Sequence, residues 1–256
     1  MLWSILIVIV PSKLASPCAS LVAMEYTDSY RAFCERLKIS RKLLGYDQVR
    51  MASDLDMTRD EYANKESGRT MITGTDLKKI YNIGMDIDKL LVNVERNVNC
   101  QILMRKIMAF NNAAEIEYVK GVVTEYVLYL CEQHLDDFTE NVLKNIRILK
   151  AFDNISSKNT GSMLKCVRDI NGITDQLMIS EDLGISRYKY SKIENNKEYP
   201  DAMVLIRLYE LYGYLPTMYL DLYDVRIEML DNIYDSMEIR EQDLIIKFID
   251  NLKQFV

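Results

Sequence analysis

The sequence has few of the residues on which all-β folds and most catalytic sites depend. Its 256 residues include only 9 glycines and 4 prolines, too few for the many tight turns of an all-β fold. His134 is the single histidine, which argues against an acid–base triad, and the chain has no phosphate loop or glycine-rich nucleotide motif. We therefore expect long helices, no enzymatic activity and no cofactor.

Cysteine pairs and excess positive charge are also lacking. The five cysteines are dispersed without a C-x-x-C pair, which argues against a metal site and favours free thiols in a reducing, cytoplasmic compartment. The net charge of −6 excludes a protein that coats nucleic acid or an anionic membrane by bulk attraction. Specific DNA binding stays open, because it needs only a local basic face.

The N-terminal end carries a strongly apolar run. Residues 2–10 read LWSILIVIV, and Pro11 ends the run. The run resembles a signal-peptide core, but no basic residue precedes it and ten residues cannot span a bilayer. Two interpretations stay open for residues 1–23. They are an extension that is mis-started or disordered, with Met24 opening the soluble domain, or they are a secretory or anchoring signal. We leave them out of the fold prediction and expect no membrane partner.

Beyond this run the apolar spacing predicts helices. One helical face is formed by Tyr30, Phe33, Cys34 and Leu37. Gly45 closes this helix, and two short helices joined by a tight turn follow it. Thr58 is the expected N-cap of the second short helix, with Glu61 three residues later as in a capping box.

The same pattern recurs with a shift of 128 residues, which places Gln176 against Gln48 and Glu194 against Glu66. Further matched pairs are Met51 with Ile179, Ala52 with Ser180, Leu55 with Leu183, Thr58 with Ser186, Arg59 with Arg187 and Tyr62 with Tyr190. Two unrelated amphipathic helices would not share turn, cap and core positions, so we infer two copies of one unit. Each copy continues into a helix closed by glycine, Gly84 or Gly213. One extra residue by then predicts a longer loop after the second copy's helix pair.

The predicted fold is all-α, with two such domains joined and followed by additional helices. Residues 24–92 form the first domain and residues 163–222 the second. A helical connector covers residues 93–153, and residues 154–162 (NISSKNTGS) have the composition of a linker. Residues 223–256 form a C-terminal helical tail. Its apolar stripe consists of Leu244, Ile245, Phe248, Ile249 and Leu252.

The repeated motif reads Gln-x-x-apolar-small-x-x-Leu-(Gly/Asp)-apolar-(Ser/Thr)-x-x-x-Tyr-x-x-x-Glu and resembles the helix-turn-helix of Xre/Cro-like, lambda-repressor-like transcriptional regulators. The resemblance covers residues 30–91 and 163–220. The small residue lets the two helices approach, and Gly184 at the turn accepts a positive φ at little cost. Asp56 takes its place in the first copy, a costlier choice. Asn196 likewise replaces Gly68.

The resemblance implies that the second helix of each pair is a recognition helix that lies in the major groove of double-stranded DNA. The start of the first helix meets phosphate in this family, which makes Gln48 and Gln176 candidate backbone contacts. The other candidates in the second copy are Ser186, Arg187, Tyr188, Lys189, Lys192 and Lys197. Those in the first copy are Thr58, Arg59, Asp60, Asn64 and Lys65.

The two recognition helices are chemically unequal. The second copy is rich in basic residues, whereas Asp60 and Glu61 lie near the tip of the first. Phosphate repels carboxylates, so we expect the second copy to be the stronger DNA reader. The alternative for each basic residue is an ordinary solvated charge, and for Tyr188 an exposed tyrosine without a special role.

Two functions therefore compete. The first is a sequence-specific DNA-binding transcription regulator, and the alternative is a helix-turn-helix scaffold that holds a protein partner without binding DNA. For the connector and the tail we expect packing and dimerisation, and the alternative is that they sense a peptide or small-molecule effector. The dimer would be a homodimer or an intramolecular pseudo-dimer of the two copies.

Overall fold

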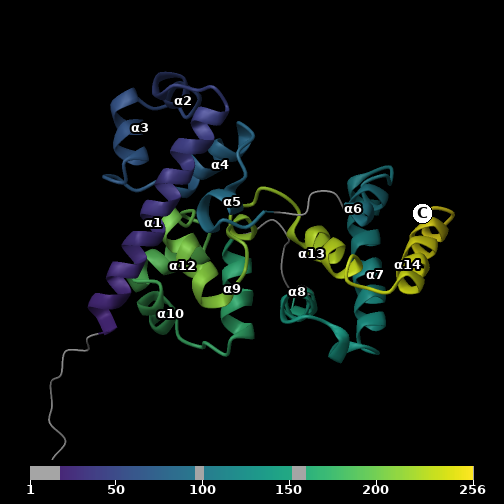
Figure 1. Ribbon diagram of the computed structural model, residues 1–256. Coiled ribbons are helices and arrows are strands. Elements are labelled where there is room, and N and C mark those ends of the chain that lie inside the picture. Colours follow the sequence, from purple (N-terminus) through teal and green to yellow (C-terminus); the bar gives the residue numbers. More distant parts are fainter. Residues whose placement is uncertain (1–17, 96–100, 152–159, 256) are drawn as a thin grey trace, which may run out of the picture.

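The computed structural model describes residues 18–95, 101–151 and 160–255 (Figure 1). Every regular element within these residues is a helix, which confirms the predicted all-α fold. None of the helices in this described part has both the length and the apolar character needed to cross a bilayer. The predicted N-terminal extension and linker lie largely outside these residues, although helix α1 already begins at Cys18 and α9 at Thr160.

The first unit contains the first predicted copy. Its helices are α1 (Cys18–Leu43), α2 (Gln48–Asp54), α3 (Arg59–Glu66), α4 (Gly74–Asn82) and α5 (Ile87–Val92). The predicted capping box is confirmed, since Thr58 accepts the N–H of Glu61 and the Glu61 carboxylate accepts the N–H of Thr58. Tyr62 on α3 and Met51 on α2 are fully buried between the helices. The local signals in the sequence therefore produce the helix pair as expected.

The second unit repeats this order. Its helices are α9 (Thr160–Ile170), α10 (Gln176–Asp182), α11 (Arg187–Glu194), α12 (Ala202–Tyr212) and the 3-10 helix η3 (Pro216–Tyr219). The prediction of a longer loop after α11 is wrong, because the N-caps of α4 and α12, Thr73 and Asp201, keep the shift of 128 residues. The extra length lies in α12, which has 11 residues where α4 has 9 and runs on until Gly213 turns left-handed at φ +75°.

The turns inside the two helix pairs have the predicted conformation. Gly184 has a φ of +67°, and Asp56 adopts a similar left-handed conformation with a φ of +55°. Asn196 and Gly68, which follow α11 and α3, are also left-handed. A residue with a side chain adopts this conformation at a cost that glycine avoids, so the turn of the first copy is the more strained of the two.

A third unit combines the predicted connector and the predicted tail. Its helices are α6 (Ile102–Ile107), α7 (Ala113–Cys131), the 3-10 helix η1 (Leu135–Asp137), α8 (Glu140–Ala151), α13 (Val225–Tyr234) and α14 (Ile239–Leu252). Helix α13 packs against α6 and α8, and α14 against α7 (Figure 1). The rings of Tyr126 and Phe248 lie 4.5 Å apart. The connector and tail are helical, and they share one core.

Asp231 of α13 closes the N-terminus of α6. Its carboxylate accepts the backbone N–H groups of Leu103 at 2.8 Å and Met104 at 3.3 Å, in place of a cap that Gln101 does not supply. Burial raises the pKa of Asp231 to about 6, although these two hydrogen bonds act in the opposite direction.

Acidification is expected to stabilise the wild-type protein relative to Asp231→Asn. The folded-state pKa lies above the ordinary value of 3.8, so the folded protein takes up this proton before the unfolded chain does. The stabilisation is complete below about pH 4 and is lost as the pH rises through 6, and its full size is about 3 kcal/mol. Urea denaturation of both proteins at pH 7 and pH 4.5 measures it. An unchanged difference in unfolding free energy between the two pH values would contradict the assignment.

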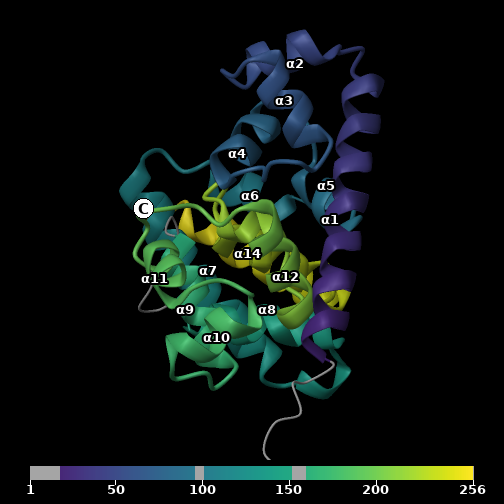
Figure 2. The same cartoon turned by 90° about the vertical axis from the view of Figure 1, so that its left-hand side faces the viewer.

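The first and second units lie directly against each other. Figure 2 shows α1 running along both units, with α2 to α4 at one end and α10 to α12 at the other. Helix α5 packs against α12 and η3, and the Ser29 hydroxyl on α1 donates to Glu210 on α12 at 2.8 Å. The third unit joins this pair through the contact of α8 with α9. The two copies are therefore parts of one packed body.

Candidate nucleic-acid interface

A buried carboxylate fixes the two helices of the second unit. Glu194 at the end of α11 accepts from Arg168 Nε at 3.0 Å, from Tyr190 Oη at 3.3 Å and from the side-chain amide of Gln176. Tyr190 and Ile193 are fully buried on the same side of α11. The helix is held along this face, so its opposite face is directed outward.

The first unit repeats this arrangement more tightly. Glu66 accepts from Arg41 at 2.6 and 3.1 Å, from Gln48 at 2.7 Å and from Tyr62 at 3.0 Å. Burial opposes ionisation of Glu66, but the hydrogen bonds from Arg41, Gln48 and Tyr62 outweigh it and hold its pKa below the usual value. The two glutamines predicted to meet phosphate thus also hold the end of the recognition helix.

The prediction did not include the two arginines of these networks. Arg41 and Arg168 each lie four residues before a left-handed glycine, Gly45 or Gly172. Each also donates to the carbonyl oxygen of the residue after that glycine, at 2.7 Å in the first unit and 3.0 Å in the second. The repeated Arg-x-x-x-Gly spacing was the sequence signal that could have revealed them.

The N-terminal end of α11 presents the predicted DNA-facing residues. Ser186 caps the helix by accepting the N–H of Lys189 at 3.2 Å. Arg187 is exposed and has no acidic partner in the part of the chain that the structure describes. The side chain of Tyr188 is also exposed, at 73%. These neighbouring residues form a free surface that is basic and aromatic.

The predicted lysines of the second unit differ in their surroundings. Lys189 is half-buried, and its ammonium lies 2.5 Å from the carboxylate of Asp201, the N-cap of α12. The ammonium of Lys192 lies over the Tyr188 ring at 4.8 Å from its centre. Lys197 is exposed in the loop that follows α11. Arg187 and Lys197 are therefore the most accessible of these cations.

The corresponding face of the first unit is more acidic. Arg59 lies 3.3 Å from the carboxylate of its neighbour Asp60, whose side chain is 86% exposed. Asn64 is half-buried, and Lys65 forms an ion pair with Asp76 of α4. The structure thus supports the expected inequality of the two recognition helices: α11 presents unpaired positive charge, and α3 presents compensated charge.

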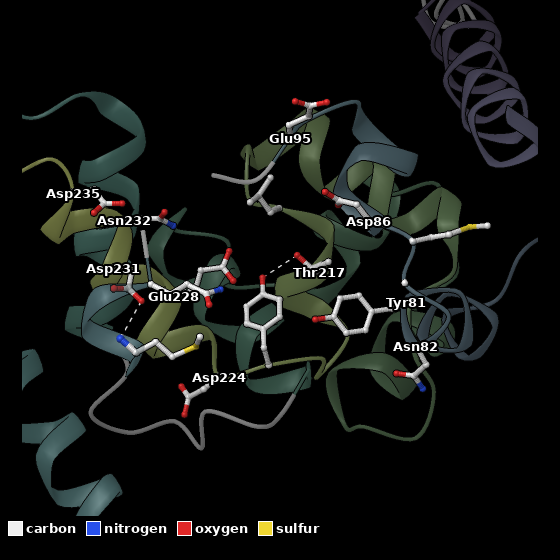
Figure 3. Close-up of a pocket in the computed structure, with 16 residues that line it drawn as sticks. Tyr81, Asn82, Asp86, Glu95, Thr217, Asp224, Glu228, Asp231, Asn232 and Asp235 are labelled. Carbon is white, nitrogen blue, oxygen red and sulfur yellow. Dashed lines mark hydrogen bonds between the residues drawn. The ribbon is translucent and has the colours of Figure 1, made fainter. Parts of the chain in front are cut away.

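A large cavity lies where α6 and α13 of the third unit meet the other two units. Its volume is about 790 Å³, and Figure 3 shows its acidic lining. The carboxylates that line it belong to Asp86, Glu95, Asp224, Glu228, Asp231 and Asp235. The lining residues that the structure describes include Tyr81 and Tyr223 but no lysine or arginine. The cavity would repel a phosphate or another anion, so it is not part of a nucleic-acid interface.

Comparison with known proteins agrees with this geometry for the second unit. No curated protein and no solved structure matches the chain. A family model described as a helix-turn-helix domain matches residues 161–225, from α9 to the first residue of α13. The second unit is therefore similar to helix-turn-helix domains, a fold that DNA-binding regulators use at their interface with the duplex.

Proposed function

We propose that this protein is a sequence-specific DNA-binding transcription regulator of the Xre type, and that α11 enters the major groove. The observation that carries the proposal is the exposed N-terminal end of α11, where Arg187 and Tyr188 point away from the core that holds Tyr190 and Ile193. Recognition helices of this fold contact base edges with the residues of that end.

The surroundings of each side chain suggest its role. Arg187 can donate two hydrogen bonds to a guanine, and Tyr188 can touch a thymine methyl group. Lys192 and Lys197 are placed for phosphates that flank the groove. Gln48 and Gln176 each commit one amide N–H to a buried glutamate, so the second N–H is the one that would reach a phosphate. Lys189 would have to share its ion pair with Asp201 to contact DNA.

A gel-shift titration of the full chain with random duplex DNA tests this function. For roughly four phosphate contacts, the affinity is expected to fall about 100-fold when the salt concentration rises from 50 to 200 mM, because binding releases counterions. The competing function, a scaffold for a protein partner, predicts no duplex binding at either salt concentration. It is favoured by the exposed carboxylate of Asp60 on the recognition helix of the first unit. Binding that is absent or independent of salt would therefore contradict the proposal.

A further inference from the structure

The contact between the first and second units joins matching positions of the two copies. Asp88 and Thr217 are the second residues of α5 and η3, and they are separated by 129 residues, the shift that also relates Gly84 to Gly213. The buried carboxylate of Asp88 accepts the backbone N–H of Thr217 at 3.0 Å and its hydroxyl at 2.5 Å. A residue meets its own counterpart only close to a twofold axis.

A second contact is reciprocal in the same way. The backbone N–H of Ala202 donates to the carbonyl oxygen of Ile72 at 3.1 Å. The counterparts of these residues at the shift of 128 are Gly74 and Pro200, and these also meet. A Cβ atom at position 74 would lie only 2.5 Å from the carbonyl oxygen of Pro200. Two contacts that exchange partners in this manner are typical of a twofold interface, which here forms within a single chain.

The two recognition helices are placed by this local twofold. Helices α3 and α11 lead into the loops of residues 67–73 and 195–201, and these loops end at the contact. A groove of about 630 Å³ at the contact is lined by Thr73 and Thr75 of the first unit and by Lys189 and Lys197 of the second. Duplex DNA has twofold axes perpendicular to its length, so two helices related in this way fit half-sites of opposite orientation.

We infer that one chain, paired within itself, binds a DNA site made of two dissimilar half-sites in inverted orientation. The inference rests on the proposed function and adds the form of the DNA partner. The half-sites differ because α11 presents an unpaired Arg187, whereas its counterpart Arg59 on α3 lies beside Asp60. The local twofold is already complete within one chain, so a second chain is not needed.

In vitro selection from a random duplex library with the full chain tests this inference, followed by native mass spectrometry of the selected complex. The expected result is two unlike, inverted half-sites about one helical turn apart, with one chain bound per duplex. Inserting five base pairs between them should lower the affinity at least tenfold, because the second half-site moves to the other side of the duplex. A single half-site, or a symmetric site bound by two chains, would overturn the inference and leave the proposed function standing. No enriched sequence at all would overturn both.

Gly74→Ala probes the contact between the units directly. The new methyl group would meet the Pro200 backbone, so the affinity for the complete site should fall at least tenfold, while that for the isolated α11 half-site stays unchanged. Gly121→Ala on α7 is the matched control, because a Cβ there meets nothing within 4 Å. Equal affinities of the two variants for the complete site would overturn the inference. Circular dichroism verifies that both variants keep their helices.

Discussion

Charge reversal at Arg187 is expected to remove most of the specific DNA affinity and to leave the second unit folded. Arg187 is the first residue of α11, is exposed, and has no acidic partner among the described residues. A two-hydrogen-bond contact with a base contributes about 1–3 kcal/mol, and Arg187→Glu adds repulsion from the phosphates. We expect an affinity loss of about 100-fold for the selected duplex, measured by fluorescence anisotropy, with unchanged circular dichroism.

Arg59→Glu is the matched control in the first unit. Arg59 holds the corresponding position on α3, but its guanidinium already lies 3.3 Å from the Asp60 carboxylate. Its reversal should therefore cost less than about tenfold in affinity, within the range of a single phosphate contact. If Arg187→Glu binds the duplex as well as the wild type, α11 is not the reader. If Arg59→Glu has the larger effect, the first unit is the stronger reader.

The largest loss of stability is expected for Glu66→Ala. Only 7% of the Arg41 side chain and 4% of the Glu66 side chain are exposed, so removing the carboxylate leaves a buried guanidinium without its counter-charge. Breaking one partner of a buried ion pair typically costs about 3–5 kcal/mol. Tyr62 and Gln48 also lose their acceptor. Urea denaturation should show this decrease in the unfolding free energy.

Two variants separate the loss of the buried charge from the loss of any carboxylate. Glu66→Gln keeps acceptor atoms for part of the network and should cost less than Glu66→Ala. Glu140→Ala removes an exposed ion pair with Arg147, at 2.9 Å, and should change the unfolding free energy by no more than about 1 kcal/mol. A similar cost for Glu66→Ala and Glu140→Ala would show that the buried network does not stabilise the fold.

The helix pairs could be predicted because their signals are local. A cap such as Thr58 acts on backbone groups within one helical turn, and the buried Tyr62 follows the helical period of its own segment. The comparison of two copies in one chain strengthened each signal, since Ser186 and Tyr190 occupy the same places in the second copy. The helix bounds therefore agree at the shift of 128 residues.

The assembly of the units could not be predicted in the same way. Asp88 meets Thr217 across 129 residues, and Leu103 meets Asp231 across 128 residues, and no helical period records such contacts. The tail was expected as a separate segment because its stripe shows only that it needs an apolar partner. That α7 is this partner, through contacts such as that of Tyr126 with Phe248, follows from the tertiary packing.

The candidate interface was predicted in part. Exposure of Arg187 and Tyr188 follows from their places on the helix opposite Tyr190 and Ile193. The partners of the lysines did not follow, because Lys65 and Lys189 reach carboxylates on the next helix, at its first turn or its cap. A motif assigns a residue to a face of a helix, and only the packed structure gives its ion pairs.

Photo-crosslinking from position 188 tests the central claim most directly. A photo-reactive phenylalanine analogue replaces Tyr188 in one variant and Tyr129 on α7, whose side chain is 61% exposed, in the other. With the selected duplex bound, the account predicts crosslinks to DNA from position 188 and none from position 129. Binding without a crosslink from position 188, or with crosslinks from position 129 alone, would show that the duplex lies elsewhere and that α11 is not in its groove.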